Sequence, residues 1–265
     1  MSTLSLDHLT VFDASPTELV TIAADLGLKL VSLWTQLPLK ADLPLVTEAN
    51  KAETLARMRD TGVRLGNVEC FNLTPEVAVE EFRPAVALGA ELGATSLVAI
   101  NAWDPERNRA LDNFAKLTRI AAEYGMKANV EFISMGKVRT LADAIAFIID
   151  SGEPNVGVTI DFLHLIRTGG TAADIRVMDP AQIGYVQICD GPAGLAREEW
   201  NDEGFEQRQM PGDGEFPLAE LIAAVPEGVV LGVEVPHRAL REAGVSAAER
   251  ARRAVEGTQR FLAAT

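Results

Sequence analysis

Short apolar runs rich in β-branched residues alternate with longer helical patterns along this chain of 265 residues. Such alternation is typical of βαβ units, whose strands lie parallel in one sheet. The apolar runs cover residues 4–12, 28–34, 63–70, 95–101, 127–133, 156–161, 183–190 and 229–235. Strands that are each followed by a helix or a helical turn, repeated in this way, favour a closed barrel. We therefore predict an α/β fold, a single (β/α)8 TIM barrel, with one domain over residues 1–265.

A doubly wound open sheet is the alternative for a chain with this alternation. Its usual purpose is to bind a dinucleotide, for which a G-x-G-x-x-G motif follows the first strand. No such motif follows the first apolar run at residues 4–12. The sequence therefore favours the barrel over the open sheet.

Several helix boundaries are also marked in the sequence. Thr140 is of the type that caps a helix start, and we expect a helix to begin there. Another helix is expected from Pro75 to Gly93, and Pro84 should kink it because proline lacks the N–H that a helix interior needs. A final charged helix is expected over residues 246–264.

The formal net charge of −14 and the sequence pI of about 4.7 restrict the partners. An acidic surface repels phosphodiester backbones, which argues against nucleic acid. The first residues lack the basic segment and apolar run of a signal peptide, and no stretch approaches the roughly 20 apolar residues of a membrane helix. Cys70 and Cys189 provide no disulfide framework. We therefore expect a cytoplasmic protein that does not enter the membrane.

Each of the last four apolar runs carries one strong oxygen donor near its C-terminal end: Glu131, Asp161, Gln187 and Glu234. An ionised carboxylate among valines and isoleucines costs several kcal/mol unless it is paired or binds a metal. Active sites of such barrels lie at the C-terminal ends of the strands and combine residues from several of them. We therefore expect the four side chains to converge, although any one alone also fits a strand-end cap or a salt-bridge partner.

Three carboxylates that converge without a cation would repel one another and raise their pKa values. A divalent metal ion removes this conflict, so we interpret the four residues as metal ligands. An all-oxygen set without a thiolate favours Mn2+ or Mg2+ over Zn2+, with Mn2+ as the first choice. Affinity alone leaves Co2+ and Zn2+ open.

At these residues the sequence resembles the xylose isomerase-like barrels that are often grouped as sugar phosphate isomerases/epimerases. The resemblance covers most of the chain and is clearest in VEF (130–132), DFLHL (161–165), YVQICDG (185–191), PGDGEFPL (211–218) and VEVP (233–236). It implies the metal ligands Glu131, Asp161, Gln187 and Glu234. Gln187 departs from the histidine of the common H-x-K-D pattern, here Q-I-C-D, and offers a neutral and weaker oxygen ligand.

The resemblance also implies roles for residues around the metal. In the resembling enzymes two metal-bound glutamates serve as acid and base, and here these are Glu131 and Glu234. The residues assigned to substrate binding are His164, Arg208, Asp190 and His237. Asp190 and His237 each follow a predicted ligand closely in the sequence. Without the resemblance, His164 also fits a loop histidine bonded to the backbone, Arg208 a solvated surface arginine and His237 an exposed side chain.

For the activity, the resemblance implies an isomerase or epimerase that acts on a keto-sugar, a sugar phosphate or a related polyhydroxy carbonyl compound through a metal-bound enediolate. The same intermediate can lose a β-hydroxyl, so a metal-dependent dehydratase or lyase of a keto-polyol or a dehydroshikimate-like acid is the runner-up. A non-catalytic sugar-binding barrel and an apurinic-site endonuclease are further alternatives, although three histidines are few for a zinc cluster. The expected partner is a small molecule, and a homo-oligomer is allowed because relatives are often dimers or tetramers.

Overall fold

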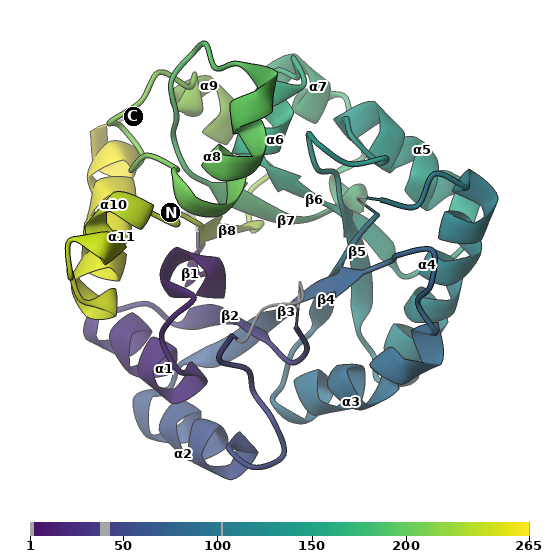
Figure 1. Cartoon of the computed structure of the whole chain (residues 1–265), viewed down its shortest axis with the longest axis horizontal. Coiled ribbons are helices and arrows are strands. Elements are labelled where there is room, and N and C mark those ends of the chain that lie inside the picture. Colours follow the sequence, from purple (N-terminus) through teal and green to yellow (C-terminus); the bar gives the residue numbers. More distant parts are fainter. Residues whose placement is uncertain (1–2, 38–42, 102, 265) are drawn as a thin grey trace.

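The computed structural model of the protein describes residues 3–37, 43–101 and 103–264. Its parallel strands close into one barrel in the order in which they occur in the chain (Figure 1). The strands are β1 (Thr3–Leu6), β2 (Leu30–Trp34), β3 (Arg64–Asn72), β4 (Ser96–Ile100), β5 (Lys127–Glu131), β6 (Val156–Asp161), β7 (Ile183–Ile188) and β8 (Val230–Val233). β8 pairs with β1 along its whole length and closes the ring. The predicted fold class, a (β/α)8 barrel, is confirmed.

The chain also forms helices, and most of them lie around the outside of the ring of strands (Figure 1). They are α1 (Pro16–Asp25), α2 (Lys51–Thr61), α3 (Arg83–Glu91), α4 (Arg107–Glu123), α5 (Leu141–Ser151), α6 (Phe162–Arg167), α7 (Ala172–Arg176), α8 (Trp200–Glu206), α9 (Leu218–Ile222), α10 (Arg238–Glu242) and α11 (Ala247–Ala264). Short 3-10 helices occupy His8–Val11, Val79–Phe82, Pro180–Gln182 and Arg197–Glu199. Within the described ranges, no helix is both long and apolar enough to cross a membrane.

Two of the expected helix starts illustrate how capping chemistry acts in this chain. Thr140 caps α5 as predicted, and it forms a reciprocal capping box with the third residue of the helix. The helix expected from Pro75 to Gly93 is wrong in extent, because α3 begins only at Arg83. Pro84 lies in the first turn of α3, where a missing N–H loses no hydrogen bond. The proline therefore starts a helix instead of kinking one.

The core between strands and helices is apolar, whereas the strands also carry buried polar side chains. Phe114 of α4 and Phe147 of α5, for example, are buried and contact each other with ring centroids 5.4 Å apart. On β8, a methyl group in place of the Gly232 hydrogen would collide with the Asp7 carboxylate and the Tyr185 hydroxyl. Glycine here leaves room for polar groups within the barrel. Other buried polar residues on the strands are Ser5, Ser32, Asn67, Asn129 and Thr159.

Candidate functional site

A cavity of about 250 Å³ lies at the C-terminal ends of the strands, the end at which barrels of this kind carry their active sites. Its apolar walls are formed by Leu9, Phe12, Trp34, Leu43, Ile100, Ile133, Met135 and Phe205. A group of buried polar side chains, here called the cavity floor, also lines it: Glu69, Glu131, His164, Gln187, Arg208 and Glu234. The cavity is thus apolar around its sides and polar in one place.

The four predicted metal ligands come together at this end of the barrel. Glu131 ends β5, and Asp161 ends β6 and pairs in register with Gln187 of β7. Glu234 directly follows β8. All four are buried, and Glu131 is the most exposed of them at 8%. Parallel strands of similar register therefore deliver the four side chains to one locus.

Arg208, which follows α8, brings a positive charge to the cavity floor. Its Nη1 lies 2.8 Å from Oδ2 of Asp161 and 2.9 Å from Oε2 of Glu234. Its Nε donates a hydrogen bond of 2.9 Å to the Gly204 carbonyl, which fixes the guanidinium from the other side. A guanidinium at this distance favours the ionised form of Glu234. It forms no ion pair with Glu131, as far as the described residues go.

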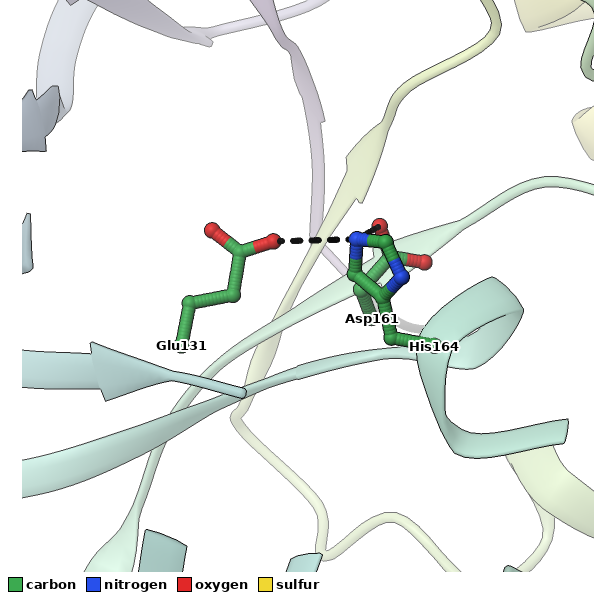
Figure 2. Close-up of side chains that lie close together, drawn as sticks. All are labelled: Glu131, Asp161 and His164. Atoms are coloured by element: carbon green, nitrogen blue, oxygen red, sulfur yellow. Dashed lines mark ion pairs between the residues drawn. The ribbon is translucent and has the colours of Figure 1, made fainter. Parts of the chain in front are cut away.

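Glu131, Asp161 and His164 face one another (Figure 2). Nε2 of His164 lies 3.9 Å from Oε1 of Glu131 and 3.9 Å from Oδ2 of Asp161. Nδ1 of His164 lies 3.4 Å from the backbone nitrogen of Ser134 and 3.1 Å from the Ser134 hydroxyl oxygen, so it has a hydrogen-bond partner in either neutral tautomer. Burial lowers the pKa of His164 to about 4. At pH 7 the ring is therefore neutral.

Burial also changes the acidity of the two glutamates on the floor. It raises the pKa of Glu131 to about 8, and the nearby charge of Asp161 adds to this effect. It raises the pKa of Glu234 well above its usual range, although Arg208 acts in the opposite direction. Both pKa values rise because burial removes the carboxylates from water and so disfavours their ionised form. The positive charge of Arg208 offsets only part of this effect.

A second pair of buried acidic residues, Asp7 and Glu69, lies close to Glu234. The Tyr185 hydroxyl donates a hydrogen bond of 2.6 Å to Oδ1 of Asp7, and Asn67 donates one of 3.1 Å to Oε1 of Glu69. Nε2 of Gln187 lies 3.4 Å from Oδ2 of Asp7 and 3.4 Å from Oε1 of Glu69. Burial raises the pKa of Asp7 to about 7. The sequence analysis missed Asp7, although a carboxylate inside an apolar run was the signal that found the others.

Three buried oxygens of the predicted ligands accept no hydrogen bond: Oδ2 of Asp161, Oε1 of Gln187 and Oε2 of Glu234. The first and third lie at ion-pair distance from Arg208 but outside hydrogen-bond geometry. A buried acceptor without a donor costs about 1–3 kcal/mol. Oxygen atoms left without donors are what a hard divalent cation binds, so these residues fit such an ion.

Two groups of side chains at this end of the barrel also place their possible ligand atoms close enough together to bind one metal ion. The ligand atoms of Glu131, Asp161 and His164 all lie within 4.8 Å of one another, and those of Asp7, Glu69 and Glu234 do so as well. In the second group, Asp7 and Glu69 already accept hydrogen bonds from neighbouring side chains. The first group, together with the unpartnered oxygens, is therefore the better match to a cation.

The structure does not bring Asp190 and His237 to the cavity. The buried Asp190 carboxylate accepts backbone N–H groups of Gly191, Gly212 and Phe216 at 2.8, 2.9 and 3.0 Å, so it fixes the loop over residues 211–218. Nδ1 of His237 accepts the N–H of Leu240 at 3.4 Å and caps α10. Neither residue lines the cavity. Their assignment to substrate binding lacks support from this geometry, whereas His164 and Arg208 both line the cavity.

Comparisons with known proteins agree with this fold. The family model for the xylose isomerase-like TIM barrel matches residues 20–263. A 3-dehydroshikimate dehydratase of Pseudomonas aeruginosa is 26% identical over 223 residues, which are 83% of this chain but only 31% of that protein. The structure of the IolI protein with a zinc atom covers 100% of this chain and 99% of its own, at a TM-score of 0.78 and 19% identity.

An epimerase is also among the similar structures. D-Allulose 3-epimerase from Methylomonas sp. aligns over 98% of this chain and 98% of its own, with a TM-score of 0.72 and 16% identity. At such identities the likeness to either solved structure concerns the fold alone. The dehydratase is more similar in sequence, but this chain spans less than a third of its length.

Proposed function

Because the chain belongs to the xylose isomerase-like TIM barrel family, we propose that it is a metal-dependent dehydratase. Its substrate would be a small ring compound of the dehydroshikimate class, which bears a ketone, hydroxyl groups and a carboxylate. The sequence analysis favoured an isomerase or epimerase and kept the dehydratase second. The contacts and walls of the cavity support the opposite order, and so does the dehydratase name of the Pseudomonas aeruginosa relative.

The observation that carries the proposal is the unequal hold on the two glutamates of the cavity floor. Glu234 is fixed at both oxygens, with Oε2 2.9 Å from Arg208 and Oε1 accepting a hydrogen bond of 2.9 Å from Gln187. Among the described residues, the Glu131 carboxylate has a single ion-pair partner, the His164 nitrogen at 3.9 Å. A two-base epimerisation needs a free glutamate on each face of the substrate, whereas elimination needs one base. The inequality favours elimination, with Glu131 as that base.

The walls of the cavity support a ring over an open-chain sugar. A ring can lay an apolar face against side chains such as Trp34, Ile100 and Phe205. An open-chain keto-sugar carries a hydroxyl group on nearly every carbon, and each one buried against an apolar wall without a partner costs free energy. The polar groups of a ring acid, in contrast, lie along its edge and can face the cavity floor.

A divalent metal ion completes the proposed site. Its ligands would be Glu131, Asp161, Gln187 and Glu234, and the oxygen-only set keeps Mn2+ as the first choice. When bound, the ion supplies Lewis-acid polarisation of the substrate carbonyl, which makes the adjacent C–H group more acidic. Proton transfer and binding of the substrate are assigned to side chains of the protein.

In the proposed reaction Glu131 removes the proton from the carbon next to the ketone. The bond from the neighbouring carbon to its hydroxyl oxygen then breaks as a carbon–carbon double bond forms. The departing oxygen takes up the proton held by Glu131 and leaves as water, which restores the carboxylate. The neutral His164, with its proton on Nε2, would give the departing oxygen a hydrogen bond and keep that proton, and Arg208 would bind the substrate carboxylate with its guanidinium.

Epimerisation of a ketose is the second candidate, because Glu131 and Glu234 both line the same cavity. Mass spectrometry separates the two reactions. We would incubate the Mn2+-loaded protein with 3-dehydroshikimate and, separately, with D-allulose. We expect loss of one water from the ring acid, no change of the ketose, and no reaction in the Glu131→Gln variant. A ketose converted to an isomer of unchanged mass, with the ring acid untouched, would contradict the dehydratase.

A further inference from the structure

The third predicted ligand differs from the others, because it is an amide. A carboxylate presents oxygen at both of its outer positions, but the Gln187 side chain presents a carbonyl oxygen at one and an NH2 group at the other. Only the oxygen can bind a cation. An amide ligand therefore has to be held in one of two orientations that have nearly the same shape.

Three carboxylates surround the nitrogen end of this amide. Nε2 of Gln187 donates to Oε1 of Glu234 at 2.9 Å, and it lies 3.4 Å from Oδ2 of Asp7 and 3.4 Å from Oε1 of Glu69. If the amide were reversed beside the ionised carboxylates that bind a metal or its ligands, its carbonyl oxygen would stand at these distances from three carboxylate oxygens with no proton between them. That arrangement is repulsive, so the surroundings select one orientation.

The oxygen end of the amide is left without a partner. Oε1 of Gln187 is buried and accepts no hydrogen bond, and the whole residue is 2% exposed. One oxygen each on Asp161 and Glu234 likewise accepts no hydrogen bond, although both of these oxygens lie at ion-pair distance from Arg208. The selected orientation therefore turns the Gln187 carbonyl, which has no partner, towards the same locus as the other predicted ligands.

We propose that Asp7 and Glu69 are positioning residues that hold the Gln187 amide with its carbonyl oxygen free to bind the metal. The proposal rests on the metal site of the proposed function and assigns a task to two acids outside its ligand set. The two acids are themselves held in place, Asp7 by the Tyr185 hydroxyl at 2.6 Å and Glu69 by the Asn67 amide at 3.1 Å. Groups that orient a metal ligand in this way are worth about 10- to 100-fold in metal affinity.

The substitution Asp7→Asn tests the proposal with almost no change of shape. Tyr185 donates to one oxygen of residue 7, so the remaining carbonyl of an asparagine would stay on that side. The new NH2 group would then face the NH2 group of Gln187 and favour the reversed amide. We expect the dissociation constant for Mn2+, measured by calorimetry on the metal-free protein, to rise about 10- to 100-fold. Glu69→Gln should act in the same direction and serves as the second variant if Asp7→Asn does not fold.

Two further measurements separate positioning from a general structural effect. Asp104 is also a buried acid next to a barrel strand, but its carboxylate pairs with Arg109 at 2.6 Å and does not line the cavity. Asp104→Asn should leave the Mn2+ affinity within about twofold, as expected for a site without shared partners. In a Gln187→Ala background, Asp7→Asn should cause no further loss, because the amide that it acts on is gone.

The outcomes distinguish this inference from the proposed function. If the wild-type chain binds Mn2+ and folded Asp7→Asn and Glu69→Gln bind it equally well, the positioning role is overturned and the metal site stands. A loss of the same size with and without Gln187 would overturn it too. A folded wild-type chain that binds no divalent ion would overturn the metal site and the positioning role together.

Discussion

The two glutamates of the cavity floor are chemically identical but are held very differently. Glu234 is clamped between Arg208 and Gln187, each at 2.9 Å, and is 3% exposed. Glu131 is 8% exposed, and within the described part of the chain its carboxylate pairs with the nitrogen of His164 alone, at 3.9 Å. A clamped carboxylate can define where a cation sits but cannot follow a substrate proton. The fold thus gives one predicted ligand, Glu234, a fixed carboxylate and leaves the other, Glu131, loosely held, which is the difference that an elimination with a single base requires.

Loss of the free glutamate should have the largest effect. Glu131→Gln keeps an oxygen that can face a metal but removes the carboxylate that accepts a proton. We expect kcat to fall about 10²- to 10⁴-fold, the usual contribution of a general base. Saturation with Mn2+ should not restore the rate. Turnover near that of the wild type would show that Glu131 is not the base.

Loss of the clamped glutamate should act through the metal instead. Glu234→Gln removes a charge from the ligand set and from the contact with Arg208, so we expect nearly all turnover to disappear at limiting Mn2+ while the fold persists. Excess Mn2+ should recover part of the rate, unlike in the Glu131 variant, and calorimetry should show weaker binding by roughly 10-fold or more. Equal and complete losses in both variants at saturating Mn2+ would favour the two-base epimerase.

The pH dependence of stability should also distinguish the free base from a metal-bound site. Burial raises the pKa of Glu131 to about 8 from 4.5 and that of Asp7 to about 7 from 3.8. A carboxyl group with a raised pKa stabilises the fold fully below its unfolded pKa and loses this contribution as the pH rises towards the folded pKa. We expect the metal-free chain to melt at a lower temperature at pH 8 than at pH 6. Bound Mn2+ should reduce the difference, and an identical slope with and without metal would contradict the site.

The smallest effect is expected from the neutral ligand. Gln187→His restores the side chain that is common in the family, so metal binding should persist. An imidazole is softer than an amide oxygen, and we expect the preference to move towards Zn2+ or Co2+ by a factor of a few. Competition between metals in a single dialysis experiment measures this. An unchanged affinity and an unchanged order of metals would mean that Gln187 is not a ligand.

The fold was largely predictable because the spacing of apolar residues and the residues that cap helices act over short stretches of sequence. Every predicted apolar run overlaps a barrel strand, and Thr140 caps a helix by chemistry that involves only its own first turn. The segment from Pro75 to Gly93 was not predictable in detail. A proline tells where a regular helix cannot continue, but whether it kinks a helix or begins a new one depends on the surrounding packing.

The site was predictable where a polar residue ends a strand, because the register of the barrel then fixes its neighbours. Asp161 beside Gln187 is such a case. Asp190 also follows a strand and looked like a further site residue, yet its carboxylate accepts hydrogen bonds from backbone N–H groups of a loop distant in the sequence. Asp7 was missed because its partner Tyr185 lies on a strand far away in the sequence. A carboxylate inside the first apolar run marked Asp7 as unusual, but its contact with Tyr185 follows from closure of the barrel and could not be predicted from the neighbouring residues.

Metal content per chain tests the central claim most directly. The protein would be stripped with EDTA, reloaded from an equal mixture of Mn2+, Mg2+, Co2+ and Zn2+, and analysed by plasma mass spectrometry beside Glu131→Ala. We predict one tightly held ion per wild-type chain and its loss in the variant. A folded wild-type chain that retains no ion would contradict the account, because Glu131, Asp161, Gln187 and Glu234 would then serve the structure alone.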